Sequence, residues 1–174
     1  YLNIQEIIQV AKMVDADAIH PGYGLLSEKP EFAEACIEAE LTFIGPSPKT
    51  MRQLGNKVTA RKMAVKAGVR VIPASDILPE STDKLNKIAK DLGLPLMLKA
   101  SWGGGGRGMR LIKNLKDLEK NILEGKREAT NAFGNSESFL EKYIENARHV
   151  EVQILGDKDG NIYHLWERDC SIQR

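Results

Sequence analysis

Apolar positions in the first 50 residues predict helices that alternate with short strands. Apolar side chains recur at helical spacing over residues 3–15 and again around Phe32 and Cys36, which predicts two amphipathic helices. A short apolar stretch follows each helix, at residues 17–20 and 42–44, and each stretch ends in a turn of proline and glycine. Helices that alternate with short apolar strands are typical of a parallel α/β sheet.

The next segment predicts two more helices and then a change of domain. Ser47 and Pro48 have the pattern of an N-cap and a first helical position. Asn56 is the expected cap of a helix over residues 57–67 that Gly68 ends. A strand over residues 69–72 and a linker over residues 77–81 are expected to follow. The domain boundary is therefore expected between residues 72 and 80.

The remaining residues predict a small α+β unit and then a β-hairpin. Helices and strands of the α+β unit are expected over residues 81–92, 94–100, 109–112, 115–132 and 136–144. Two further strands, over residues 149–155 and 162–166, are expected to pair around a turn at residues 157–160.

Composition excludes several classes of protein. The formal net charge is only +1, so no basic excess favours nucleic acid as a partner. No apolar run is long enough to span a membrane, so no membrane partner is expected. Two cysteines fit a reducing compartment, so we expect a cytoplasmic location, or the mitochondrial matrix in a eukaryote. The chain starts at Tyr1 and ends without turn residues, so we expect it to be cut from a larger protein.

Residues 103–108 read Gly-Gly-Gly-Gly-Arg-Gly and are the clearest candidate for a binding site. So many glycines carry a large ordering cost, which is typical of a backbone that approaches phosphate oxygens. The spacing also fits the dinucleotide pattern, but a strand and not a helix is expected next, which argues against that fold. A glycine hairpin over phosphates is therefore predicted, with a flexible surface hairpin as the alternative.

Two lysines strengthen the phosphate interpretation. Lys99 is the one charged residue in the apolar stretch 95–100, and a buried lysine needs an anionic partner or a lowered pKa. Lys57 starts a predicted helix, where an ammonium group and a helix N-terminus together suit an anion. The alternatives are a lysine that reaches solvent from an edge strand for Lys99 and a solvated first-turn lysine for Lys57.

The strand predicted at residues 149–155 alternates polar and apolar residues. His149, Glu151 and Gln153 would share one face, which either lines a ligand cleft or faces solvent. No histidine and cysteine set has zinc spacing, so no metal site is expected in the chain.

Several short segments, taken in order, resemble the biotin carboxylases of the ATP-grasp superfamily. They include His20-Pro21-Gly22-Tyr23-Gly24, Leu54-Gly55-Asn56-Lys57, Leu98-Lys99-Ala100, the glycine loop through Met109, Glu141-Lys142-Tyr143, Arg148-His149-Val150-Glu151 and Glu167-Arg168-Asp169-Cys170-Ser171. The resemblance covers the whole chain. Ser101-Trp102 before the glycines resembles the pyruvate carboxylase branch, because the subunit of acetyl-CoA carboxylase usually has glycine in place of Trp102.

The resemblance implies a layout of four segments. Residues 1–50 would end a Rossmann-like N-terminal domain, and residues 51–72 would be connecting helices. Residues 73–143 would be the α+β ATP-grasp lid, and residues 144–174 the first strands of the larger ATP-grasp subdomain.

The resemblance also implies roles for individual residues. Lys57 and Lys99 would contact ATP phosphates, and Gly105 and Gly106 would close over them. The adenine pocket would be lined mainly by backbone groups of Glu141, Lys142, Tyr143 and Ile144. His149 and Gln173 would contribute on the nucleotide side, with Glu151 in support. Catalytic residues and magnesium ligands would lie beyond residue 174, so the chain alone is expected to be inactive.

The implied reaction uses Mg-ATP and bicarbonate to form carboxyphosphate, whose CO2 is captured by biotin on a separate carrier domain. ATP, bicarbonate and the biotinyl carrier domain are thus the implied partners, and a homo-oligomer is implied for the full-length protein. Other biotin-dependent carboxylases, and a non-catalytic nucleotide-binding module, are the alternatives.

Overall fold

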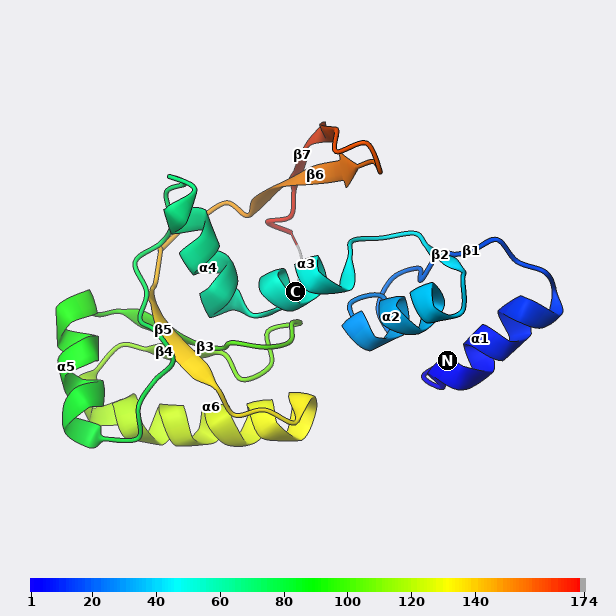
Figure 1. The fold of residues 1–174 in the computed structure, drawn as a ribbon. Coiled ribbons are helices and arrows are strands. Elements are labelled where there is room, and N and C mark those ends of the chain that lie inside the picture. The colour runs from blue at the N-terminus through cyan, green and yellow to red at the C-terminus, as the bar shows by residue number, and fades with distance from the viewer. Residues whose placement is uncertain (173–174) are drawn as a thin grey trace. The chain divides into compact units, whose positions relative to one another are not determined.

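The computed structural model describes residues 1–172, which form two compact units, residues 1–142 and residues from 143 onward (Figure 1). The helices of the first unit are α1 (Ile4–Met13), α2 (Pro30–Glu38), α3 (Pro48–Gly55), α4 (Lys57–Lys66), α5 (Thr82–Leu92) and α6 (Leu118–Phe133). Its strands are β1 (Ala18–Ile19), β2 (Thr42–Phe43), β3 (Leu96–Ala100), β4 (Arg110–Ile112) and β5 (Ser138–Lys142). In the described residues, no helix is long and apolar enough to cross a membrane.

Strands β1 and β2 pair in parallel, which confirms the α/β prediction for the N-terminal segment. Both strands are only two residues long, shorter than predicted. Helices α1 and α2 cover them through a core that includes Ala11, Phe32 and Cys36. The rings of Phe32 and Phe43 meet edge to face, with centroids 5.8 Å apart. Burial raises the pKa of the Cys36 thiol, so this cysteine is a packing residue and a poor nucleophile.

The predicted helix caps are confirmed at α3 and α4. The Ser47 hydroxyl accepts a hydrogen bond from the Thr50 N–H at 3.1 Å. The Asn56 side chain accepts from the N–H groups of Val58 and Thr59, each at 3.0 Å. The strand predicted at residues 69–72 is wrong. No strand partner lies beside that apolar stretch, and its residue Val69 is 57% exposed.

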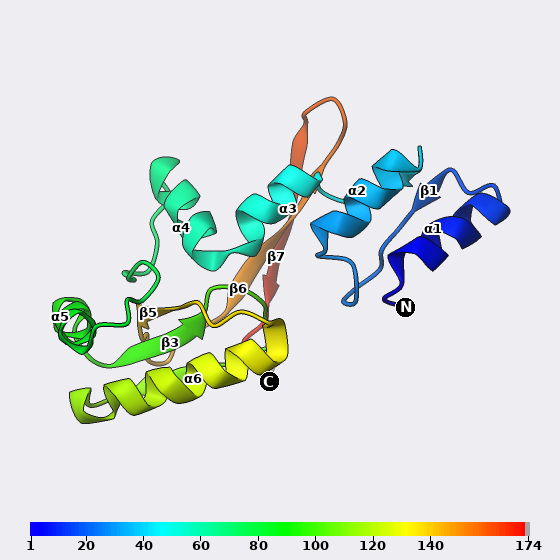
Figure 2. The ribbon, with the colours of Figure 1, turned by 60° about the horizontal axis from the view of Figure 1, so that its bottom comes forward.

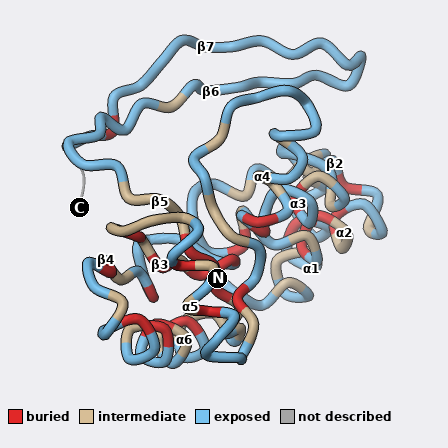
Figure 3. Tube along the Cα trace, turned by 90° about the vertical axis from the view of Figure 1, so that its left-hand side faces the viewer, coloured by how far each residue is buried: buried red, intermediate tan, exposed pale blue. Residues whose placement is uncertain are grey.

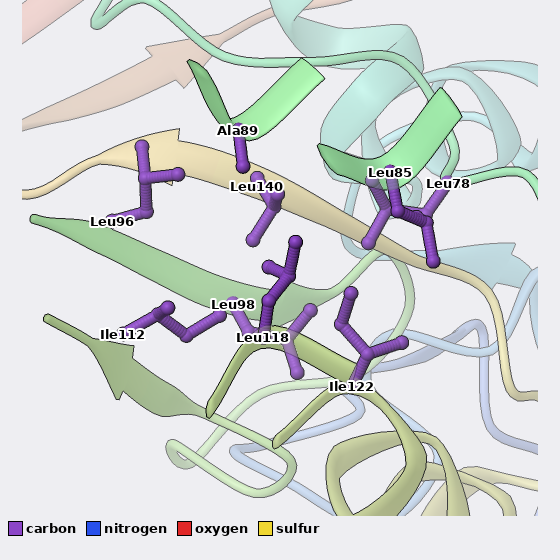
Figure 4. Close-up of a cluster of buried hydrophobic side chains, with 9 residues drawn as sticks. All are labelled: Leu78, Leu85, Ala89, Leu96, Leu98, Ile112, Leu118, Ile122 and Leu140. Atoms are coloured by element: carbon purple, nitrogen blue, oxygen red, sulfur yellow. The ribbon is translucent and has the colours of Figure 1, made fainter. Parts of the chain in front are cut away.

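Strands β4, β3 and β5 form an antiparallel sheet in that order. Helices α5 and α6 pack against this sheet, and Figure 2 shows them near β3 and β5. Alternate residues Leu96 and Leu98 of β3 are fully buried, and both face the helices. Figure 4 shows the cluster that they form with the other members: Leu78, Leu85, Ala89, Ile112, Leu118, Ile122 and Leu140. The predicted α+β unit is therefore confirmed, with a hydrophobic core between one sheet face and two helices.

The ends of this sheet differ from the prediction for a local reason. The ladder between β3 and β5 ends at Leu96 opposite Lys142, and the next residue, Pro95, has no N–H to continue it. Strand β5 therefore stops before Tyr143. On its other edge, β5 is paired by residues 73–78, where Pro73 accepts a hydrogen bond from the Lys142 N–H and Ser75 donates to the Leu140 carbonyl. Part of the segment expected to be a linker is thus tied to the sheet.

The second unit contains the predicted hairpin, β6 (Val150–Gly156) and β7 (Ile162–Asp169). The two strands pair in antiparallel fashion, with a bulge between Val152 and Ile154. Trp166, which lies at the bulge, has a positive φ of 68°. Figure 3 shows that almost all of both strands is exposed, in contrast to β3 and β5.

Candidate functional site

The glycine loop joins β3 to β4 as a hairpin. The two strands are antiparallel, with Leu98 opposite Arg110, so the loop is followed by a strand, as the sequence predicted. Gly103, Gly105, Gly106 and Gly108 all have positive φ, which only glycine adopts without strain. A side chain on Gly104 or Gly105 would meet no atom within 4 Å. The loop thus presents bare backbone to open space, which suits an approaching polyphosphate.

Lys99 lies on the sheet face opposite the α5 and α6 core. Because Lys99 is opposite Phe139 and Met97 is opposite Glu141, Lys99 and Glu141 are diagonal neighbours on the same face. Their side chains form an ion pair, with Lys99 28% exposed and Glu141 15% exposed. The sequence required an anionic partner for a half-buried lysine, and the chain itself supplies one. An incoming phosphate would have to share the Lys99 ammonium with Glu141.

Lys57 starts helix α4, as predicted, but the helix N-terminus does not offer free N–H groups. The Lys57 N–H donates to the Ser101 carbonyl at 2.9 Å, and Asn56 occupies the next three donors through its side chain and carbonyl. An anion here would therefore meet the ammonium group alone. That ammonium donates to the Gly103 carbonyl at the start of the loop. Desolvation and, to a smaller extent, the nearby Lys99 charge lower the pKa of Lys57.

These groups surround one small cavity of about 190 Å³. Its lining comprises Lys57, Lys99, Ala100, Trp102, Gly103, Gly104, Gly105, Gly106, Arg107 and Met109. Three cationic side chains and open loop backbone give the cavity the chemistry of a phosphate site. Its volume is below the roughly 300–1,000 Å³ typical of whole-ligand sites. The cavity accordingly has room for phosphate groups and not for an entire nucleotide.

The other residues predicted for the site have contacts of their own or belong to the second unit. The Lys142 ammonium donates to the carbonyls of Gly93 and Leu94, both at 2.9 Å, and so it supports the C-terminal end of α5. Tyr143, Ile144 and His149 belong to the second unit. The His149 backbone is held within that unit, since its N–H donates to the Ser171 hydroxyl at 2.9 Å. Gln173 lies outside the described residues.

Sequence reasoning missed three residues at the site. Arg107 lines the cavity, and its cationic side chain within the glycine run was the available sign. Trp102 also lines it, and its indole N–H donates to the Glu137 carboxylate at 2.9 Å. Nothing in the sequence pointed to Glu137, which is separated from Trp102 by β4 and α6. Within residues 1–172 no group of three or more potential metal-ligating side chains occurs.

Comparison with protein families gives two matches that together span nearly the whole chain. The family described as "Carbamoyl-phosphate synthase L chain, ATP binding domain" matches residues 56–174. The family described as "Biotin carboxylase, N-terminal domain" matches residues 1–51. The same residues that carry the glycine loop and both lysines therefore fall in a family of ATP-binding domains.

Curated relatives cover the whole chain. Human mitochondrial pyruvate carboxylase is 52% identical over 174 residues, and the biotin carboxylase of Halalkalibacterium halodurans is 51% identical. The chain spans 15% of the length of the first relative and 38% of the second.

Solved structures agree with this pattern. Pyruvate carboxylase from Rhizobium etli matches with a TM-score of 0.92 at 61% identity, over all of this chain and 15% of that one. A biotin carboxylase complex with β-γ-ATP from Campylobacter jejuni matches with a TM-score of 0.96 at 49% identity, over all of this chain and 39% of that one. The chain therefore belongs to the family of carbamoyl-phosphate synthase L chain ATP-binding domains. Its N-terminal segment and its relatives identify it as part of a biotin carboxylase.

Proposed function

We propose that this chain supplies the phosphate-binding part of the ATP site of a biotin-dependent carboxylase. The observation that carries the proposal is the cavity where the ammonium groups of Lys57 and Lys99 meet the open backbone of the glycine loop. Two fixed cations and a run of unshielded N–H groups complement the charge of a polyphosphate. Phosphoryl transfer depends mainly on positioning the phosphate groups and neutralising their charge, and such a site does both.

Each predicted residue has a role in this proposal. Lys57 and Lys99 hold phosphate oxygens, and the N–H groups of Gly105 and Gly106 close over them. The backbone of Glu141 through Ile144 contacts the adenine base, and Lys142 does so through its carbonyl, since its ammonium supports α5. His149 and Gln173 contact the nucleotide from the second unit, with Glu151 in support. The proposed segments are residues 1–50, 51–72, 73–143 and 144–174, as the resemblance implies.

The relatives support ATP and bicarbonate as substrates. The biotin carboxylase domain of 2-oxoglutarate carboxylase from Hydrogenobacter thermophilus, 48% identical over the whole chain, was solved as a dimer with MgADP, ADP and bicarbonate. We propose that the full-length protein uses Mg-ATP and bicarbonate in the same way, with magnesium ligands and catalytic residues beyond residue 174. Biotin, carried on a separate domain, would accept the carboxyl group.

The parent enzyme is proposed to be a pyruvate carboxylase. Trp102 before the glycine loop and 61% identity to the Rhizobium etli enzyme support this choice over other biotin-dependent carboxylases. The dimer named for 2-oxoglutarate carboxylase supports a homo-oligomer. A reducing location, cytoplasmic or in the mitochondrial matrix, is proposed from the two cysteines, and the human relative is named as mitochondrial.

Calorimetry of MgADP binding to the full-length protein tests the proposal. Lys99→Met keeps the aliphatic stem and removes the charge, and we expect the Kd to rise at least about tenfold, or about 1.4 kcal/mol. Lys84→Met, an exposed lysine on α5, is the matched control and should leave the Kd unchanged. Failure of the folded wild-type protein to bind nucleotide would overturn the proposal.

A double variant removes one ambiguity. Lys99→Met leaves the Glu141 carboxylate without its ion-pair partner, so repulsion by Glu141 and loss of a phosphate contact would both weaken binding. Glu141→Gln in the Lys99→Met background neutralises that carboxylate. If the double variant binds like Lys99→Met, Lys99 contacts the phosphates directly. If it binds like the wild type, the phosphate role of Lys99 is wrong.

A further inference from the structure

The first end of the glycine loop is attached to its surroundings through Glu137. The Glu137 carboxylate accepts hydrogen bonds from the Ser101 hydroxyl at 3.1 Å and from the Trp102 indole at 2.9 Å. Ser101 is fully buried, and its N–H donates to the Glu137 carbonyl at 2.9 Å. Side chain and backbone of Glu137 therefore hold the two residues that precede the glycines.

The second end of the loop is attached to helix α6. The Glu128 carboxylate lies 2.8 Å from the Arg110 guanidinium, and its hydrogen bond from the Gly108 N–H is the main cause of its lowered pKa. Gly108 also packs against Gly125 of α6. A Cβ on Gly108 would lie 3.2 Å from the Gly125 carbonyl oxygen, and a Cβ on Gly125 would lie 3.0 Å from the Gly108 oxygen. Backbones this close leave Gly108 little room to move.

Between these ends the loop is free of packing. Gly104 and Gly105 have no atom near the position of a Cβ, and Gly106 has only the Met109 sulfur at 3.8 Å. Arg107 is exposed. Ser101 and Gly108 are buried, whereas the residues between them are exposed. This contrast indicates which part of the loop is able to move.

We propose that Glu128 and Glu137 are positioning residues that hold the two ends of the glycine loop, so that only residues 104–107 move when the loop closes on a ligand. Restricting the movement to four residues lowers the conformational entropy lost on closure. The identity of the ligand as a nucleotide rests on the proposed function, whereas the attachment of the loop ends does not.

Limited proteolysis of the full-length protein tests the proposal. Trypsin cleaves after Arg107, and mass spectrometry of the products measures that cut separately from others. We expect Glu128→Gln to accelerate the cut about fivefold without nucleotide, because local opening of the loop becomes easier. MgADP should protect this variant less than the wild type. Glu124→Gln, one turn earlier on α6 and exposed, makes the same charge change and should behave as the wild type.

Glu137 offers a rescue experiment at the other end. Glu137→Ala removes the acceptor for the Trp102 indole and should accelerate the Arg107 cut about as much as Glu128→Gln. Glu137→Gln keeps an amide oxygen at the same place and should restore most of the wild-type resistance. A general loss of structure would not be rescued in this way. Equal cleavage of both variants and the wild type would overturn the role of Glu137.

The remaining outcomes are also decisive. If Glu128→Gln fails to fold, Arg110→Gln removes the same ion pair from the other side and should accelerate the cut about two- to threefold. Cleavage of Glu128→Gln or Arg110→Gln at the Glu124→Gln rate would overturn the proposal. If wild type binds no MgADP while the cut still accelerates in Glu128→Gln, the attachment stands and the proposed function falls.

Discussion

Strand β3 of the sheet and strand β6 of the hairpin both carry apolar residues at alternate positions, but these residues differ greatly in burial. In β3 every second residue is buried, and Leu96 and Leu98 are fully so. In β6 the apolar residues Val150, Val152 and Ile154 remain 48%, 53% and 52% exposed. The sheet has two helices of its own unit against its apolar face, whereas the described part of the second unit contains no helix. Alternation therefore marks a face that can be buried, and adjacent elements decide whether it is.

Substitutions in the two apolar faces give the largest expected difference. Leu98→Ala should lower the free energy of unfolding by about 2–5 kcal/mol, because it leaves a cavity in a closed core. Ile154→Ala should change it by no more than about 0.5 kcal/mol, because half of that side chain is already in water. Chemical unfolding of the 174-residue chain, followed by hydrogen exchange at β3 and β6, measures both. Equal losses of unfolding free energy in the two variants would contradict the proposed difference between the buried sheet and the exposed hairpin.

The glycine loop sharpens the comparison within the sheet unit. Gly103→Ala should cost about 1–3 kcal/mol of stability, because its Cβ would lie 2.4–2.6 Å from the Phe133 ring and its φ is +79°. Gly104→Ala meets open space and should cost less than about 0.5 kcal/mol. Thermal unfolding compares the two variants. Phe133→Leu, alone and together with Gly103→Ala, completes a double-mutant cycle whose coupling energy measures the clash apart from the backbone strain.

The sequence predicted the elements better than their contacts. Caps at Ser47 and Asn56, the parallel pairing of the N-terminal strands and the glycine loop as a hairpin follow from short-range rules, and all are confirmed. The strand at residues 69–72 failed because apolar content alone does not provide a partner strand. Strand β5 ended early because of Pro95, which is distant in sequence and adjacent in space.

The site shows the same division. Lys99 was predicted to need an anionic partner or a lowered pKa, and that requirement follows from its strand alone. The identity of the partner as Glu141 depends on the register of β3 against β5, which the sequence does not state. At the N-terminus of α4, the acceptor of the Lys57 N–H likewise comes from Ser101, 44 residues away, whereas the Asn56 cap is local and was predicted. Chemistry that arises within an element was predictable, and chemistry that arises between elements was not.

Lys57 gives a smaller effect that depends on pH. Its pKa is lowered in the folded protein, because the charged form is disfavoured there. The resulting cost to stability is complete below the folded pKa and is lost as pH rises from that value to the ordinary lysine pKa. A bound phosphate would favour the charged form, so ligand binding at alkaline pH should take up protons. Calorimetry of MgADP binding at pH 9 in two buffers with different ionisation enthalpies measures the uptake. Lys57→Gln should abolish it, and an unchanged uptake would place the proton elsewhere.

The smallest expected effect lies at the end of the hairpin, where polar contacts and not packing hold the strands. The Asp169 carboxylate binds the Arg148 guanidinium at 2.7 Å and accepts from the Ser171 N–H at 2.8 Å. Hydrogen bonds from Ser171 and then from Arg148 lower its pKa to about 2. Because the pKa is depressed below the unfolded value of about 3.9, the contribution to stability is complete above that pH and is lost between pH 4 and 2.

Carboxyl NMR titration of Asp169 measures this directly. A midpoint near 2 would show that the open hairpin keeps its end contacts in solution even though its apolar residues stay in water. A midpoint for Asp169 near the ordinary value of about 4 would mean that the Arg148 and Ser171 contacts do not persist. The end of the hairpin would then lack the Asp169 contacts as well as a packed core, and the contrast with the sheet would be greater than the structure indicates.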